Sequence, residues 1–262
     1  MSHYTDIGFK IEKNEDVVNT FNFINSNGKI KRLTWDLPSQ NKDDNIVLTM
    51  FYIGEIRYSA KLNLKTNYIL DIGLSHNNER ICKAEHIGTL NAVNDESGFK
   101  VVQVEKDGIP FWFSCPNVEI FNIQDGKREE LDLKIASFAE NIEIKEKAPE
   151  RKTENKQMTP EEVVEFVKEN GIQMADESYI AFFNDDPTYA HVSGTIKDFK
   201  LEKNEITTVK YYAIDIDCLG LYFKVLVDPK LINKKKLKKG NILSGVFWNT
   251  VLLVADNHPD YF

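Results

Sequence analysis

The stretch Glu55-Ile-Arg-Tyr-Ser-Ala-Lys-Leu-Asn63 decides the fold class, because its apolar and polar residues alternate without a break. Successive side chains of a β-strand point to opposite faces of the sheet. The apolar residues from Ile56 to Leu62 would therefore pack on a core, and the polar residues from Arg57 to Lys61 would face solvent. The stretch predicts a strand with one wet face.

Turn signals recur at short intervals on both sides of this strand and extend the β pattern from Asn45 to Lys145. Asp107-Gly108 and Asp125-Gly126 are typical of tight hairpins, since both positions tolerate a positive φ. Apolar runs lie between the turns, and we interpret them as strands of an antiparallel sheet or barrel. The predicted strands include Tyr68–Leu74, Phe99–Val104, Phe111–Phe113 and Val118–Ile123.

One helix precedes these strands. Val17, Phe21 and Ile24 recur at helical spacing within the stretch Asp16–Ile24, which predicts a helix with one apolar side. We therefore predict an N-terminal domain, residues 1–144, that consists of this helix and the antiparallel strands.

A charged segment separates this part from the rest of the chain. The run Lys145-Glu-Lys-Ala-Pro-Glu-Arg-Lys-Thr-Glu-Asn-Lys-Gln157 has too few apolar residues to contribute to a core, so we interpret residues 145–158 as a linker. Thr159-Pro-Glu-Glu162 follows it. This is a capping box with proline at the first helical position, and it predicts a helix over Thr159–Asn170.

A second domain, residues 159–262, begins with that helix and continues as short strands. Five strands with a connection between the third and the fourth are typical of an OB-type barrel, with a generic small barrel or sandwich as the alternative. The predicted fold class is therefore β-rich α+β with an OB-like C-terminal barrel, and we expect residues 159–262 to fold alone. The five predicted strands are His191–Phe199, Thr208–Cys218, Leu221–Val227, Asn241–Phe247 and Thr250–Val254.

Three phrases of the sequence resemble a two-domain bacterial protein family of unknown function. They are His3-Tyr-Thr-Asp-Ile-Gly-Phe9, Met158-Thr-Pro-Glu-Glu-Val-Val164 and Lys239-Gly-Asn-Ile-Leu-Ser-Gly-Val-Phe-Trp248. The resemblance covers both predicted domains. It implies no activity and supplies no catalytic residues, so function has to be argued from the residues themselves.

Composition restricts the class of partner. The formal net charge is −8, and the acidic excess is spread over both predicted domains, so neither has the positive field that attracts duplex DNA or an anionic membrane. No apolar run reaches the roughly 20 residues that span a bilayer, and we see no secretory leader. The three cysteines are odd in number and widely spaced. We therefore expect a cytoplasmic protein without a disulfide framework.

Motifs for catalysis and for cofactors are missing from the sequence. It has no GxxxxGK[ST] or GxGxxG phosphate loop, no GxSxG elbow and no CxxC pair. Cys115 lies among aromatic residues before a proline, where core packing explains it better than reactivity. We therefore expect no cofactor, and we favour a binding protein over an enzyme.

Two residue pairs are candidates for a metal site, which would go with an enzyme or metal-binding protein. Asp215 and Asp217 share one face of a predicted strand, where two carboxylates can bind a divalent cation or raise one another's pKa. Cys82 and His86 share a face of another strand and bring two kinds of zinc ligand. Neither pair has an evident third ligand. A solvated strand face explains the acids better, and a buried Cys82 beside a surface His86 explains the second pair.

One predicted surface has the ingredients of single-stranded nucleic-acid binding, namely lysines beside aromatic rings. These side chains would share one face of the hairpin formed by residues 208–227. Asp215 and Asp217 would lie on the same face and repel phosphates, so nucleic acid is an alternative and not the leading hypothesis. The candidate residues are Lys210, Tyr211, Tyr222 and Lys224, together with Lys234, Lys235, Lys236, Lys238 and Lys239 of a basic run.

The leading hypothesis is a non-enzymatic interaction or adaptor protein that offers acidic β-surfaces to a protein partner. An immunity-type protein that neutralises a basic toxin would match the charge. Phe247 and Trp248 point to opposite faces of a strand, so either the chain itself or a partner must cover the outer side chain. Trp248, Tyr261 and Phe262 are the candidate partner contacts.

Overall fold

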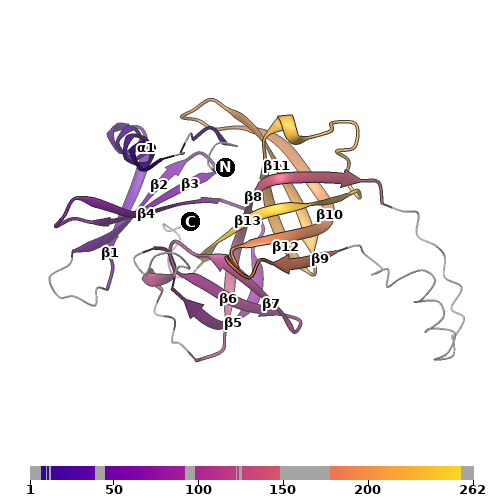
Figure 1. The fold of residues 1–262 in the computed structure, drawn as a ribbon, viewed down its shortest axis with the longest axis horizontal. Helices are drawn as coiled ribbons and strands as arrows, with labels where there is room; N and C mark the ends of the chain where they lie inside the picture. Colours follow the sequence, from indigo (N-terminus) through magenta and orange to yellow (C-terminus); the bar gives the residue numbers. More distant parts are fainter. Residues whose placement is uncertain are drawn as a thin grey trace, which may run out of the picture.

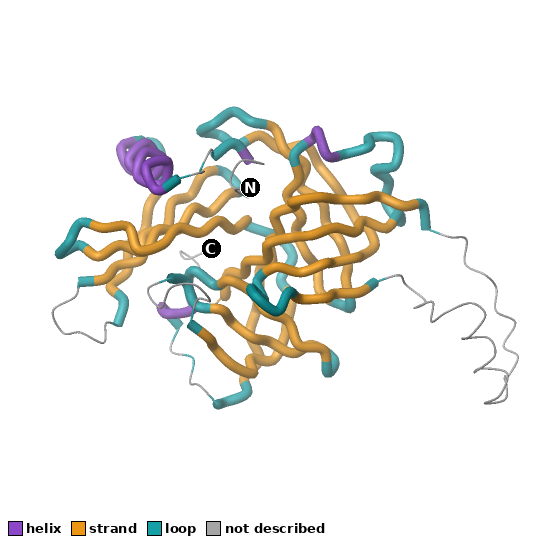
Figure 2. Tube along the Cα trace, in the orientation of Figure 1, coloured by secondary structure: helices purple, strands orange, loops and turns teal. Residues whose placement is uncertain are grey.

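The computed structural model describes residues 7–9, 11, 13–38, 45–91, 98–121, 123, 126–147 and 178–254 (Figures 1 and 2). The predicted helix Thr159–Asn170, most of the predicted linker and the pair Tyr261-Phe262 lie outside these residues. The described part is rich in β-strands, and its one α-helix is α1 (Asn14–Ser26). No helix within these ranges is long and apolar enough to cross a membrane.

Helix α1 confirms the prediction made from its apolar spacing. Ile24 is buried, and Val17 and Phe21 pack beside it on the same core. The Phe21 ring meets Phe51 edge-on with ring centroids 5.8 Å apart, which is a favoured geometry for aromatic pairs. The apolar side of the helix therefore covers one part of the neighbouring sheet.

A four-stranded antiparallel sheet lies beside this helix, with its strands in the order β1-β2-β3-β4 (Figure 1). The turn Gly54-Glu55 joins the middle two strands, and Gly54 supplies the positive φ of 56° that this tight connection needs. The strands are β1 (Lys31–Asp36), β2 (Ile46–Ile53), β3 (Ile56–Asn63) and β4 (Tyr68–His76).

The second face of β3 is buried, so the prediction of a wet face is wrong. Arg57, Ser59 and Lys61 are all buried, and residues 98–121, such as Phe99 and Pro116 beside Gly73, cover part of this side of the sheet. The Lys61 ammonium donates to the carbonyl oxygen of Gly98 at 3.3 Å and lies 2.9 Å from a carboxylate oxygen of Glu119. These partners offset the cost of burying a charge.

The other nine strands form one mixed sheet that takes strands from both sides of the predicted linker. Two long strands, β8 and β13, run antiparallel over most of their length and form a ribbon to which the other strands attach. The strands are β5 (Cys82–Leu90), β6 (Val101–Lys106), β7 (Ile109–Ser114), β8 (Glu129–Lys145), β9 (Tyr179–Phe182), β10 (Tyr189–Lys203), β11 (Lys210–Cys218), β12 (Leu221–Val227) and β13 (Ile242–Val254).

Five of these strands close on themselves. β10, β11 and β12 form an antiparallel meander, and β12 pairs in parallel with β8. β8 pairs with β13, and β13 pairs with β10. Because the last pairing returns to the first strand of the meander, β8 and β10–β13 form a closed ring, which we call the first ring (Figure 1).

The same ribbon continues into a second ring. The N-terminal part of β8 pairs with β5, the strands β5, β6 and β7 pair in order, and β7 meets β13 where Ser114 lies beside Thr250. One continuous apolar core fills both rings. Phe113 of β7 and Phe223 of β12, for example, have ring centroids 6.1 Å apart. The two rings thus share a ribbon and a core.

The strands predicted for the C-terminal domain differ from those of the first ring. The predicted strands Asn241–Phe247 and Thr250–Val254 are one continuous strand, β13, and the fifth strand of the ring is β8. The side chain of Asn249 is satisfied inside the protein, because it hydrogen-bonds Ser137 Oγ at 2.7 Å, so the strand continues through this polar position. The division into two domains stays a prediction, but β8, on the N-terminal side of the predicted linker, pairs with β12 and β13 on the other side.

The predicted strand Val118–Ile123 is also wrong, since this segment contains a 3₁₀ turn at Val118–Ile120. The side chain of Asn117 holds the segment. Its amide donates to the carbonyl of Leu253 at 2.9 Å and accepts from the Leu253 N–H at 3.1 Å. A side chain therefore takes the place of strand pairing at the end of β13.

The four-stranded sheet packs on the outside of the first ring. Tyr58 and Leu74 of the sheet belong to the same buried cluster as Phe138, Ala213 and Leu226, which point outward from the ring. Fully burying a large apolar side chain contributes about 1.5–3 kcal/mol, so several such contacts fix the sheet against the ring. The polar site described next lies at the edge of this interface.

Candidate functional site

A pocket of about 220 Å³ opens where the four-stranded sheet meets the first ring. Pockets for drug-sized ligands measure roughly 300–1,000 Å³, so this one is suited to a side chain or a small fragment. Titratable side chains dominate its wall. The lining residues are Glu55, His76, Asn77, Glu79, Asp198, Phe199, Lys200, Ala213, Asp215 and Lys224.

The alternation of side chains along the strands determines which residues line the ring side of the pocket. Ile214 and Val225 point into the core of the ring, so their neighbours Asp215 and Lys224 point outward. Asp198 of β10, Asp215 of β11 and Lys224 of β12 lie opposite one another in register and form one row across the meander. The sequence pattern thus sends three charged side chains to the same place.

Asp215 and Lys224 form a buried ion pair in this row. Their Oδ1 and Nζ atoms are 2.6 Å apart, and only 7% of Lys224 is exposed. Arg80 lies 4.0 Å from the other oxygen of Asp215, and its guanidinium stacks on the Tyr222 ring at 4.7 Å from the centroid. The charges of Asp215 and Lys224 are therefore already matched within the chain.

Behind the pocket, Glu202 collects three donors. Its Oε2 accepts from Tyr211 Oη at 2.6 Å and from His76 Nε2 at 3.1 Å, and Lys200 Nζ lies 2.6 Å from its Oε1. Burial acts to raise the pKa of Glu202, but these donors outweigh it and bring the pKa to about 2. Glu202 is therefore ionised at neutral pH and can only accept hydrogen bonds.

His76 is neutral and has one buried, unprotonated ring nitrogen. Only 1% of the residue is exposed, and burial, its largest influence, lowers the pKa of the imidazole below the ordinary 6.5, although Glu202 acts in the opposite direction. An ionised Glu202 fixes the proton on Nε2, so Nδ1 keeps its lone pair. Within the described part of the chain, Nδ1 has no hydrogen-bond partner.

Two more carboxylates stand at the mouth of the pocket. Glu55 and Glu79 are exposed, and neither lies within 4.0 Å of a cationic group in the parts of the chain described above. The pKa of Lys200 is raised chiefly by its hydrogen bond to Glu202, and the charges of Glu55 and Glu79 raise it further. The electrostatic field of these two carboxylates therefore reaches into the pocket. The mouth therefore has two exposed carboxylates that form no ion pair with the described residues.

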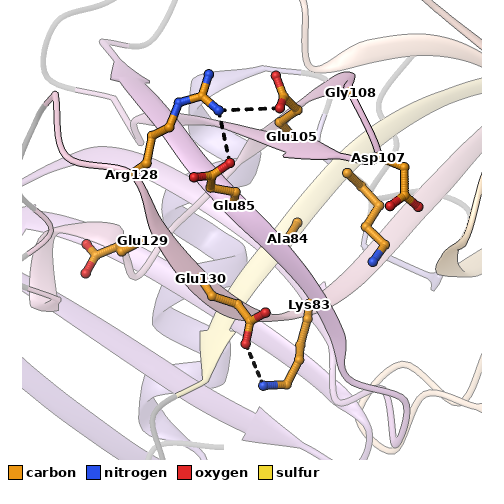
Figure 3. Close-up of a pocket in the computed structure, with 10 residues that line it drawn as sticks. Lys83, Ala84, Glu85, Glu105, Asp107, Gly108, Arg128, Glu129 and Glu130 are labelled. Atoms are coloured by element: carbon orange, nitrogen blue, oxygen red, sulfur yellow. Dashed lines mark hydrogen bonds and ion pairs between the residues drawn. The ribbon is translucent and has the colours of Figure 1, made fainter.

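A second hollow, of about 490 Å³, lies on the outer face of the second ring (Figure 3). Arg128 Nη1 lies 3.0 Å from Glu85 and 3.5 Å from Glu105, and Lys83 Nζ lies 2.7 Å from Glu130. These side chains are largely exposed, and exposed ion pairs contribute roughly 0–1 kcal/mol each. This surface is a solvated, internally matched strand face.

The candidate metal ligands do not converge. Asp215 pairs with Lys224, whereas Asp217 lies 3.1 Å from Lys197. In the described residues, no group of three or more His, Cys, Asp or Glu side chains could hold a metal ion. The two aspartates share a face, as predicted, but each has its own lysine.

Cys82 and His86 each form a hydrogen bond with another residue of the protein. Cys82 Sγ accepts from the Tyr222 N–H at 3.1 Å, and His86 Nε2 lies 2.9 Å from the Thr89 hydroxyl. His86 is fully buried, so its predicted place on the surface is wrong. Burial raises the pKa of the Cys115 thiol to about 12, which agrees with its predicted place in the core.

The candidate nucleic-acid residues are not one open face. Lys210 and Tyr211 are consecutive on β11 and point to opposite sides, so placing them on one face is wrong. Tyr211 is 1% exposed and bound to Glu202, and Lys224 is bound to Asp215. The basic run is exposed, apart from the buried Leu237 within it. It comprises Lys234, Lys235, Lys236, Lys238 and Lys239.

Trp248 lies half-buried on the outside of β13, with its ring centroid 5.4 Å from that of Phe138, whereas Phe247 is in the ring core. The two side chains thus point to opposite faces, as predicted. A contact between Trp248 and a partner stays a prediction.

Sequence reasoning missed His76 and Glu202. They lie 126 positions apart, and each lies near the end of its strand, just beyond the stretch that the sequence predicted as a strand. No spacing motif connects them, because their contact is made by packing one sheet on another.

No protein-family model matches the sequence, and neither a curated protein nor a solved structure shows significant similarity to it.

Proposed function

We propose that the chain is a non-enzymatic protein-interaction protein, and that the pocket between the four-stranded sheet and the first ring receives a cationic side chain of a basic protein partner. The observation that carries the proposal is that Glu55 and Glu79, at the mouth of a hollow of side-chain size, are exposed and form no ion pair with the described residues. The net charge of −8 would favour the approach of a basic partner.

The first ring supports this location by analogy with OB barrels. An OB barrel is a five-stranded Greek-key barrel that binds ligands on the face of its second and third strands. We propose that the first ring is OB-like, with the strand that usually comes last, here β8, ahead of the other four strands of the ring in the sequence. Its meander, its parallel pairing of β12 with β8 and its closure through β13 support this permuted order.

In this comparison β11 and β12 take the places of the second and third strands. Asp215 and Lys224 of the pocket lie on these strands, on the outer face. The fold analogy and the pocket therefore favour the same surface, although a fold alone does not define a function.

The acidic mouth argues against the two alternatives. Phosphates would meet Glu55 and Glu79, whereas the lysines of the pocket are held by Asp215 and Glu202. For an enzyme, His76 and Glu202 have the geometry of an oriented general base. The described lining of the pocket, however, contains no serine, threonine or cysteine that this base would activate.

Charge reversal at the mouth tests the proposal. The intact protein, the double variant Glu55→Lys/Glu79→Lys and the control Glu143→Lys/Glu146→Lys would be immobilised and exposed to extract of native host cells at low and moderate salt. The control makes the same change in net charge on exposed residues outside the pocket. We expect a basic protein to bind the intact chain and the control but not the pocket variant. Equal binding to both variants, or to none of the three proteins, would contradict the proposal.

A further inference from the structure

The hairpin of β10 and β11 continues past the end of the first ring. The pairing of β10 with β13 ends at Thr195, whereas β10 stays paired with β11 as far as Lys203. Phe199 and Ile214 of this hairpin pack on the core of the ring, so the alternate positions towards the turn point to the same side. These positions, which extend the inner face of the ring beyond its end, are Leu201, Lys203, Lys210 and Tyr212.

Two lysines face each other on this side of the hairpin. Lys203 and Lys210 are directly opposite in the register, and both are exposed. Among the residues that the structure describes, neither has a carboxylate partner within 4.0 Å. Like charges directly opposite one another destabilise a strand pair. An anionic group from outside would offset this repulsion.

Apolar side chains are exposed beside the two lysines. Leu201 is 50% exposed, and Tyr212, opposite it in the register, is half-buried on the ring core. The 3₁₀ turn η3 (Pro229–Leu231) lies against β11, and its Leu231 is 40% exposed. Single exposed leucines are common on protein surfaces, but here two of them border one cationic site.

The acids of this region do not neutralise the lysines. Glu202 points to the other face of β10, where Tyr211 and His76 donate to it, and Glu205 lies beside the turn at Gly54. Asp228 accepts from the backbone N–H of Lys230 at 2.9 Å, and its carboxylate is 4.0 Å from Lys230 Nζ. The surface is therefore locally positive, and at physiological salt charges beyond a Debye length of about 8 Å are largely screened.

The turn of the hairpin is held in place by the N-terminal residues. Asn204 Nδ2 donates to the carbonyl of Ile7 at 2.9 Å, and Asn204 Oδ1 accepts from the Ile206 N–H at 2.9 Å. On the other side, Ile232 follows η3 directly and is buried in the ring core. Both parts of the surface are thus fixed before anything binds, which lowers the entropy cost of binding.

We infer that this side of the hairpin, together with η3, is a docking surface for a segment of a partner protein in which apolar side chains alternate with carboxylates. The surface lies apart from the pocket, so the inference does not rest on the proposed function. We call it the hairpin patch, and it consists of Leu201, Lys203, Lys210, Tyr212, Lys230 and Leu231.

The kind of apolar side chain favours a protein segment over nucleic acid. Single-stranded nucleic acid binds through lysines and through aromatic rings on which its bases stack. In the hairpin patch the most exposed apolar groups are the aliphatic Leu201 and Leu231, whereas the ring of Tyr212 packs on the core. Leucines bury apolar side chains of a partner, and the neighbouring lysines attract its carboxylates.

Fluorescence anisotropy with the intact chain tests the inference. The probe is a labelled peptide in which leucine alternates with glutamate, and two control peptides have glutamine for glutamate or serine for leucine. We expect saturable binding of the probe with a dissociation constant on the order of 10 µM. Both control peptides should bind at least about tenfold more weakly, since each lacks one of the two kinds of contact.

Variants link the binding to the hairpin patch. Lys203→Gln/Lys210→Gln should weaken binding of the probe about tenfold, whereas Lys29→Gln/Lys65→Gln, at exposed positions outside the ring, should leave it unchanged. Because the first variant removes a like-charge pair, its thermal midpoint should not fall. If it failed to fold, the comparison of the three peptides on the intact chain would decide the question.

The other outcomes each contradict the inference. Equal loss of binding in the two lysine variants would show that the peptide responds to overall charge. Binding of the glutamine peptide as tight as that of the probe, or no saturable binding, would overturn the docking surface. A labelled oligothymidine that binds more tightly than the probe, and loses binding in Lys203→Gln/Lys210→Gln, would assign the hairpin patch to nucleic acid instead. None of these results bears on Glu55 and Glu79, so the proposed function is decided separately.

Discussion

Glu202 Oε2 accepts the Nε2–H of His76 at 3.1 Å, although these residues lie 126 positions apart in the sequence. His76 ends β4 of the four-stranded sheet, and Glu202 lies near the end of β10 in the first ring. This hydrogen bond therefore joins the two sheets. It also fixes the tautomer that leaves Nδ1 of His76 unprotonated.

The pair predicts that stability falls in two steps as the pH is lowered. The pKa of His76 is below 6.5 in the folded protein, so from about pH 6.5 downward the unfolded chain binds a proton that the folded chain does not. The contribution of Glu202 is complete above its ordinary pKa of 4.5 and is lost as the pH falls towards the folded-state pKa of about 2. Urea midpoints should therefore decrease first with His76 and again with Glu202.

A His76→Gln variant separates the two steps, because it lacks the group that titrates first. We expect its urea midpoint to be lower at neutral pH but flatter between about pH 7 and pH 5.5 than that of the intact protein. A parallel decrease in both proteins over this range would contradict the role assigned to His76.

Substitution of Glu202 tests the junction between the sheets. Glu202→Gln leaves Lys200 without its carboxylate and weakens the bonds from His76 and Tyr211, so we expect a loss of about 3 kcal/mol in the free energy of unfolding. Glu205→Gln, at an exposed position three residues away, should change it by less than about 0.5 kcal/mol. Similar values for the two variants in urea unfolding would show that the network does not contribute.

The buried polar face of β3 leads to a prediction about the free energy of unfolding. Lys61→Ala leaves the largely buried carboxylate of Glu119 without its close partner, so we expect a cost of about 3 kcal/mol. Lys65→Ala, in the exposed turn after the same strand, should cost less than about 0.5 kcal/mol. If thermal or urea unfolding gave the same small cost for both, the cover over this face would be in doubt.

Strand pairing across the predicted linker makes the fragment 159–262 a poor folding unit. This fragment lacks β8, which pairs with β12 on one side and with β13 on the other. Contrary to the expectation from sequence, we predict that it gives a largely unfolded circular-dichroism spectrum. Residues 129–262 contain all strands of the first ring and should regain β signal. Cooperative unfolding of fragment 159–262, at the temperature of the full chain, would contradict this prediction.

The elements that sequence predicted well have a regular spacing of apolar residues. The spacing of Val17, Phe21 and Ile24 is the stripe of α1, and the apolar positions of β3 face the core as expected. β8 was missed because it is covered on both sides at its centre. Leu131, Leu133 and Ile135 alternate with charged residues, but Ile135 points into the ring and Ala136 towards the four-stranded sheet, so the period of two is lost at the centre of the strand.

The candidate site could be predicted only in part, for a related reason. Asp215, Lys224 and Tyr211 were identified because they are near one another in a hairpin, but their burial depends on the sheet that covers them. His76 and Glu202 belong to different sheets, and no local pattern predicts a contact between them. Local spacing predicts neighbours along a strand or hairpin, whereas this site is made by the packing of two sheets.

The protonation state of His76 in the intact protein tests the central claim most directly. Long-range ¹H–¹⁵N NMR at neutral pH reports which ring nitrogen carries a proton. We predict a neutral ring with the proton on Nε2 and an unprotonated Nδ1, since Glu202 accepts from Nε2 and burial lowers the pKa of the ring. A doubly protonated imidazolium, or a ring with its proton on Nδ1, would contradict the claim that the hydrogen bond to Glu202 sets the tautomer of His76 and joins the two sheets.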